Sequence, residues 1–385
     1  MQKKIIALAL AGLSSTAAFG QSNVTIYGIV DAGYAYRWDP ENRTTGQHSR
    51  SSIDTGQAGA NRLGFKGVED MGNGLKAIFL LEQGFSFDNG TMGQGGKMFG
   101  RQAYVGLTGG FGTAISGRLY TPFFSLVAST DPFGAGTVGN YRNVWGNTGP
   151  FNGSPSLANL VDLTRVDNAV AYISPKFGGF DVTLAYGNAA SDNDVAAGTE
   201  DNGENSKNNT LYSALVKYNN GPTVVGFNMQ RIAARSGIPN TTLKSMDNFT
   251  LAGSFDATVV KLAAVASYSI WDTSASQGDA TTSNYLLGAT VPLGKFDLKA
   301  SINYSDFNGE ARNALNLRGQ ATQYAVGANY KLSKRTDLYT AYALIDGQAA
   351  RASSYTMADA GPNNGNAAAN NPFQQGFQLG VRHQF

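Results

Sequence analysis

The last ten residues of the chain alternate between two kinds of side chain up to the final position. The first kind is mostly apolar and comprises Phe377, Leu379, Val381, His383 and Phe385. The residues between them are glycine, glutamine and arginine. Because successive side chains of a β-strand point to opposite faces, this segment has one mostly apolar face and one polar face. A strand that contacts lipid on one side and water on the other needs this pattern. The chain end therefore predicts a transmembrane β-barrel.

The same alternation recurs along the chain. Between residues 296 and 305 every second residue is apolar, and the runs 180–187, 225–230 and 212–218 behave alike, with Leu215 as an exception. Each run has about 8–12 residues, close to the ~9–11 that a tilted strand needs to cross a bilayer. The fold class expected is therefore all-β and antiparallel.

The segments between these strands alternate in length. Seven are short turns rich in Gly, Asn, Asp or Pro, which tight turns require. Eight are long and polar, at roughly 38–60, 86–97, 120–165, 188–210, 232–247, 271–283, 306–321 and 346–375. These numbers predict about sixteen strands, with short periplasmic turns, long outer loops and both chain ends on the short-turn side. A barrel of that size encloses an aqueous channel.

The first twenty residues have the parts of a secretory signal. Lys3 and Lys4 precede an apolar run, and small residues such as Ala18 and Gly20 follow it. We expect a signal peptide at 1–20 and a single barrel domain at 21–385. No window approaches ~18 consecutive apolar residues, so the sequence predicts no membrane-spanning helix.

Composition limits the function classes. The 385 residues include no cysteine, which excludes a disulfide framework and a cysteine nucleophile. A formal net charge of +2 gives no reason to expect nucleic acid as a partner. The two histidines, His48 and His383, have no neighbouring groups that would activate a nucleophile. We expect no catalytic residues, no metal ligands and no cofactor, although a barrel hydrolase stays the less favoured alternative.

Several motifs resemble the trimeric general-diffusion porins of Gram-negative outer membranes. The resemblance covers about 22–385, and the chain end looks like the beta-proteobacterial branch. The matching segments are 24–28, 61–67 with Glu69-Asp70, 75–79, 100–107, 111–118, 332–336 and 380–385. It implies an outer-membrane channel for passive diffusion of small hydrophilic solutes and ions. A channel specific for a sugar, organic anion or peptide is the alternative.

The third outer loop, about 120–165, is the longest internal one and is expected to fold into the barrel, as it does in porins. Its segment Asp131-Pro132-Phe133-Gly134 resembles the acidic tip of the family's constriction loop. Loops of this length without secondary structure are usually functional. Asp131 is therefore expected on the acidic side of the constriction.

Strand direction and parity place the basic side. If the N-terminus is periplasmic, five arginines lie at similar height in the upper wall, namely Arg62, Arg101, Arg165, Arg118 and Arg37. Parity also turns Asp31, Lys66 and Glu82 into the lumen. The first three arginines match the basic cluster of related porins. The excess of positive charge predicts a weak anion preference.

Two partner predictions remain. Small residues on the predicted outward faces, including Gly28, Gly67, Gly106 and Gly117, suggest close approach of another wall. Together with the resemblance to trimeric porins, they predict a homotrimer packed through the N-terminal strands. The resemblance also implies contact with outer-membrane lipid and lipopolysaccharide, and recognition of the last strand, ending at Phe385, by the outer-membrane assembly machinery.

Overall fold

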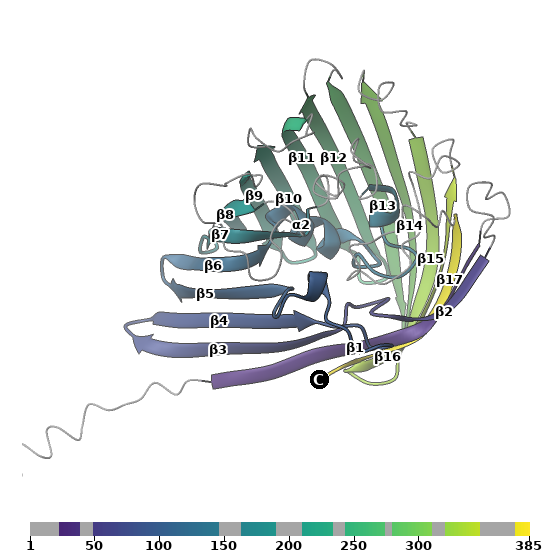
Figure 1. The fold of residues 1–385 in the computed structure, drawn as a ribbon, viewed down its shortest axis with the longest axis horizontal. Helices are drawn as coiled ribbons and strands as arrows, with labels where there is room; N and C mark the ends of the chain where they lie inside the picture. Colours follow the sequence, from purple (N-terminus) through teal and green to yellow (C-terminus); the bar gives the residue numbers. More distant parts are fainter. Residues whose placement is uncertain are drawn as a thin grey trace, which may run out of the picture.

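The computed structural model describes residues 23–38, 49–145, 163–189, 210–233, 243–273, 279–309, 320–346 and 374–385. The predicted signal peptide and His48 lie outside these ranges. The described strands form one antiparallel sheet that closes on itself (Figure 1).

The first half of the barrel comprises β1 (Asn23–Trp38), β2 (Ser49–Thr55), β3 (Arg62–Gly72), β4 (Leu75–Gly84), β5 (Gln102–Gly109), β6 (Gly112–Tyr120), β7 (Arg165–Ile173) and β8 (Phe180–Ala189). The second half comprises β9 (Thr210–Asn220), β10 (Thr223–Ala233), β11 (Leu243–Asp256), β12 (Lys261–Thr273), β13 (Ala280–Leu293), β14 (Phe296–Gly309), β15 (Gln320–Lys331), β16 (Thr336–Asp346) and β17 (Gln375–Gln384).

Two of these strands share one place in the wall. β2 pairs with residues 32–38 of β1, and β3 pairs with residues 23–29 of the same strand. β2 falls within the segment 38–60 that the sequence assigned wholly to a loop. With β2 and β3 in one position, the ring has sixteen positions, so the predicted strand number is confirmed.

The seam of the barrel joins the two ends of the chain. β1 pairs with β17, and the main chains of Gly28 and Phe385 exchange two hydrogen bonds of 3.1 Å. A Cβ on Gly28 would lie 2.4 Å from Cζ of Phe385, so the phenyl ring occupies the space that a side chain would need. Gly67 is covered in the same way by Phe79. The space above each of these two outward glycines is thus filled by an aromatic ring of the same chain.

One strand faces the opposite way from the sequence prediction. On β5 the exposed apolar residues are Val105 and Leu107, so Tyr104 and Gly106 point inward. Gly117 pairs with Tyr104 and shares its face. Parity extended from Arg101 gave the wrong face, because Arg101 precedes the first residue of β5. The outward glycines predicted on β5 and β6 are therefore wrong.

The third loop folds into the barrel. Helix α2 (Pro122–Thr130) begins with Pro122 at its first position, and Thr121 caps it by accepting a hydrogen bond of 3.1 Å from the N–H of Phe124. α2 packs against β8 to β12, and α3 (Arg142–Trp145) packs against β14 and β15. Figure 1 shows α2 inside the ring of strands.

The loop sits on an apolar patch of the inner wall. Buried wall residues that contact it include Leu215, Val265, Leu286 and Ile345. Leu215, the exception in the alternation, lies on the inner face of β9, where α2 covers it. The helix shields this apolar side chain from the water of the lumen. Burial of such side chains stabilises the loop by about 1.5–3 kcal/mol each.

Candidate functional site

A cavity of about 520 Å³ lies between the third loop and the wall, where residues of the N-terminal strands and of β14 to β17 line it. Six cationic side chains and one carboxylate line it. They are Arg62, Arg101, Arg142, Arg165, Lys299, Arg382 and Asp131. The lumen is therefore strongly positive at the height of the loop.

Arg62 and Arg101 are held by one acid. Glu82 of β4 accepts a hydrogen bond of 2.7 Å from Nε of Arg101, and Nη1 of Arg62 lies 3.7 Å from the same carboxylate. The hydroxyl of Tyr27 donates to Glu82 at 2.8 Å. In the pairing of β3 with β4, Arg62 and Glu82 lie on one face of the sheet, and exposed Leu63 lies on the other. Arg62 and Glu82 therefore face the lumen. One carboxylate cannot neutralise two guanidinium groups, so positive charge remains.

Arg165 and Arg101 meet on an aromatic ring. The Cζ atoms of Arg165 and Arg101 lie 4.9 Å and 5.9 Å from the ring centroid of Tyr120. The Tyr120 hydroxyl accepts hydrogen bonds from both guanidinium groups. Arg165 also donates to the main-chain oxygen of Arg101 at 2.9 Å. Cation–π contacts contribute about 0.5–2 kcal/mol each, enough to hold the like charges side by side.

Asp131 lies across the cavity on the third loop. Its carboxylate accepts hydrogen bonds of 3.0 Å from the N–H groups of Phe133 and Ala135, so it stabilises the turn that follows α2. Burial raises the pKa of Asp131 to about 6, and the two N–H groups and Lys299 partly offset this effect. Asp131 is thus both a lining residue and a structural cap.

Sequence reasoning did not select three of the lining cations. Lys299 and Arg382 lie on the polar faces of β14 and β17, as the alternation indicated, but their height was not predicted. Arg382 is paired with Asp337 at 3.0 Å and also reaches the oxygen of Ala58. Arg142 belongs to α3, which the sequence did not predict.

Two predicted constriction residues do not line this cavity. Arg37 points inward, but it is 1% exposed and forms a 2.6 Å ion pair with Asp54. Arg118 pairs with Ala103, on the face that carries exposed Val105, so it lies on the outer side of the wall.

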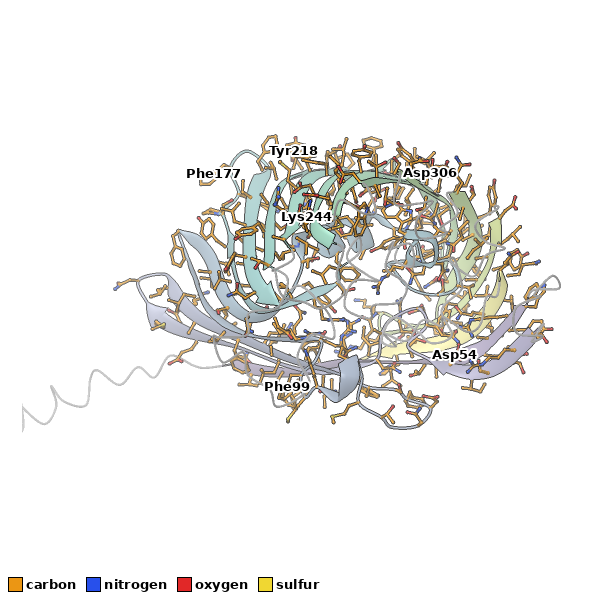
Figure 2. All side chains as sticks on the ribbon, turned by 45° about the horizontal axis from the view of Figure 1, so that its top comes forward. Asp54, Phe99, Phe177, Tyr218, Lys244 and Asp306 are labelled. Atoms are coloured by element: carbon orange, nitrogen blue, oxygen red, sulfur yellow. The ribbon has the colours of Figure 1, made fainter. Side chains whose placement is uncertain are left out.

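The outward position of Arg118 follows from the regular pairing of β6 with β5, in which Arg118 lies on the face of exposed Val105. The register shift between Gly117 and Leu119 belongs to the pairing of β6 with β7 and does not change that face. The Arg118 guanidinium forms an ion pair with Asp167. The Asp167 carboxylate also accepts a hydrogen bond of 2.7 Å from Nζ of Lys97 in the second outer loop. That loop lies on the outside, where Phe99 (Figure 2) contacts outward Phe65 edge to face. The sequence prediction assigned β5 and β6 to the wrong face and therefore placed Arg118 in the lumen.

The other predicted lumen residues have structural partners. Asp31 is fully buried and accepts hydrogen bonds from the N–H groups of Ala58 and Gly59 and from the hydroxyl of Tyr339. Lys66 lies 5.4 Å from the ring centroid of Tyr27. Within the described ranges no cluster of three potential metal ligands occurs, and no helix there is long and apolar enough to cross a membrane.

Comparison with known proteins agrees with this architecture. Outer membrane porin protein 32 of Delftia acidovorans is 32% identical over 391 residues, covering all of both chains. An outer membrane porin protein of Bordetella pertussis is 29% identical, covering 90% of this chain and 86% of the relative. The solved anion-selective porin from Comamonas acidovorans has a TM-score of 0.69 and 27% identity, covering 95% of this chain and 100% of that structure.

The profile of the Gram-negative porin family matches residues 7–350. With this match, and with a relative that is 32% identical along its whole length, the chain belongs to the Gram-negative porin family.

Proposed function

We propose that the chain forms a water-filled channel of the outer membrane through which small hydrophilic solutes and ions diffuse passively, with a weak preference for anions. The observation that carries the preference is the cavity lined by six cations and one carboxylate. The structurally similar porin from Comamonas acidovorans is itself described as anion-selective.

Within this channel, Arg62, Arg101 and Arg165 form the basic side of the constriction, and Asp131 contributes to the opposite side. A unit charge about 10 Å from a passing ion changes the energy of that ion by about 0.4 kcal/mol in water, with opposite sign for anions and cations, or about fourfold in the chloride-to-potassium permeability ratio. Glu82 and Asp337 reduce the excess positive charge but do not cancel it. Since the Debye length is ~8 Å at 0.15 M salt, the preference weakens as salt rises.

The direct test is electrical. Purified protein in a planar bilayer is placed in a potassium chloride gradient, and the reversal potential is measured in dilute and in concentrated salt. We expect chloride to be favoured in dilute salt and the preference to shrink in concentrated salt. A potassium preference in dilute salt would contradict the assignment of the cavity as the narrow passage.

Conductance as a function of electrolyte concentration separates a general channel from a solute-specific one. We expect a linear rise, because free diffusion has no saturable site. Saturation by one sugar, organic anion or peptide would indicate the specific channel instead. The relatives are channels, and we propose that this chain likewise has no catalytic activity; turnover of ester or peptide substrates by pure protein would contradict that.

Assembly is part of the same proposal. A related barrel, OmpT of Vibrio cholerae, is described in a trimer form, has a TM-score of 0.65 and 16% identity, and supports the fold alone. We infer a homotrimer, contact with lipopolysaccharide and recognition of the last strand by the assembly machinery from family membership. A monomer in light scattering and in an unheated gel would contradict the trimer.

A further inference from the structure

Three inward-facing glycines of the wall lie directly beneath side chains of the third loop. Gly226 of β10 lies under Leu126, Gly288 of β13 under Pro132, and Gly327 of β15 under Phe133. The last two are the closest to the cavity, because Pro132 and Phe133 also line it.

The fit at Gly288 leaves no room for a side chain. A Cβ there would lie 2.4 Å from Cγ and 2.7 Å from Cδ of Pro132. Carbon atoms in contact are normally about 3.5–4.0 Å apart, so the ring would have to retreat by about 1 Å. A proline ring is fixed to its own backbone and cannot rotate away, unlike Leu126 over Gly226.

Phe133 is held in a similar slot. A Cβ on Gly327 would lie 2.9 Å from Cε1 of Phe133, and a Cβ on Gly139 of the loop would lie 2.9 Å from Cγ of the same ring. The phenyl ring is therefore enclosed between the wall and the loop. β14 separates β13 from β15, so the two consecutive side chains reach two wall positions about 10 Å apart.

The turn that carries these side chains is stiff. The Asp131 carboxylate binds the N–H groups of Phe133 and Ala135, as described above. Further along the loop, the N–H of Val138 donates to Oε1 of Gln378 on β17 at 2.7 Å. A displacement at Pro132 would therefore move the whole turn rather than one side chain.

We propose that Gly288 and Gly327 are positioning residues that set the width of the passage, because they let Pro132 and Phe133 seat flush against the wall. The inference rests on the proposed channel function and concerns what determines its narrowest dimension. A side chain at either glycine pushes the turn away from β13 and β15 and toward the arginines on the other side of the cavity. The passage then narrows without any change of charge.

The test uses Gly288→Ala, with Gly110→Ala as the matched control, since a Cβ at Gly110 meets no atom within 4 Å. Two quantities are measured on folded protein: single-channel conductance and amide hydrogen exchange across residues 131–138. We expect Gly288→Ala to lower the conductance and to speed exchange at Val138, whereas Gly110→Ala behaves like the unaltered protein.

A second variant restores the fit. Pro132→Gly removes the ring. The double variant Gly288→Ala with Pro132→Gly should therefore have a higher conductance than Gly288→Ala alone. Two substitutions that act independently would not show such a recovery. If Gly288→Ala does not fold, Gly327→Ala is compared with Gly327→Ala carrying Phe133→Leu. Only the part of the change that Phe133→Leu reverses then counts, because a Cβ at Gly327 also lies 2.8 Å from the main-chain oxygen of Thr340.

Unaltered conductance together with unaltered exchange in folded Gly288→Ala would overturn the inference. Absence of pores from the unaltered protein would instead contradict the channel function, and the exchange measurement would still decide whether Gly288 seats the turn.

Discussion

The carboxylate of Glu82 lies 2.7 Å from the Nε of Arg101, and both side chains are nearly fully buried. This pair joins β4 to the residue before β5, and Arg62 approaches the same carboxylate from β3. Glu82 therefore orients two cations of the cavity and at the same time cancels part of their charge. Such a contact supports the position of the arginines more than it adds to stability, since buried ion pairs lose much of their attraction to desolvation.

Replacement Glu82→Gln should strengthen the anion preference. The amide keeps the shape: its oxygen still accepts the hydrogen bond from Nε of Arg101 and its NH2 group can donate to the Tyr27 hydroxyl, but one negative charge close to the cavity is removed. We expect up to about a fourfold rise in the chloride-to-potassium permeability ratio in dilute salt, from the Coulomb energy of one unit charge at about 10 Å acting with opposite sign on the two ions. The reversal potential measures it, and an unchanged value would show that Glu82 does not act on passing ions.

Replacement of Arg62, Arg101 and Arg165 together with glutamine should have the opposite sign. Three charges are lost and Glu82 loses its partners, so the chloride-to-potassium permeability ratio should fall by up to about sixtyfold before screening. The variant must retain the heat-modifiable mobility of a folded barrel. If the reversal potential stays that of the unaltered protein, the ions do not pass these arginines.

Arg118→Gln is the matched control for that triple change. It removes a cation from the same N-terminal strands, but on the outer face, where Arg118 binds Asp167. We expect no shift of the reversal potential, while a shift as large as that of a lining arginine would contradict its outward position.

The contrast between Arg62 and Arg118 shows what the sequence can predict. Alternation placed Arg62 correctly because β3 has no irregularity between Arg62 and Asp70. It failed at Arg118 because β5 and β6 were assigned to the wrong face, although their pairing is regular through Arg118. The face of β5 was predicted wrongly, but Arg101 still lies in the lumen. It precedes the first residue of β5, and its hydrogen bond to Glu82 of β4 directs it there.

The rest of the cavity depends on contacts distant in sequence. Lys299 and Arg382 were on polar faces in the sequence, but the stagger between strands, which sets their height, follows from barrel closure. An apolar residue on the inner face of β9, Leu215, is explained only by the packing of α2 against it. The strand number, by contrast, was predictable because turn chemistry and strand length are local properties.

The ion preference should depend on pH through Asp131. Burial raises the pKa of this carboxyl to about 6, so it is mostly ionised at about pH 7.5 and mostly protonated at about pH 5. Acidification removes the one negative charge lining the cavity, and the chloride-to-potassium permeability ratio should therefore rise by up to about fourfold as pH falls. In Asp131→Asn the preference should be high at both pH values. Equal pH dependence in this variant would assign the titration to another group.

The last prediction concerns the closing seam. Phe385 exchanges two main-chain hydrogen bonds with Gly28, and its ring fills the space above that glycine. Deletion of Phe385 removes both bonds and the ring, whereas Phe385→Leu keeps the bonds and part of the apolar cover. We expect little folded, heat-modifiable protein in the outer membrane after deletion and an intermediate amount for Phe385→Leu.

Refolding of the same variants into lipid vesicles, without any assembly machinery, separates the two roles of Phe385. If the seam contacts alone matter, the deletion should refold as poorly in vesicles as in cells. If the machinery reads the last residue, the deletion should refold in vesicles to a yield that it does not reach in cells. Normal amounts in both settings would show that neither the bonds to Gly28 nor recognition requires Phe385.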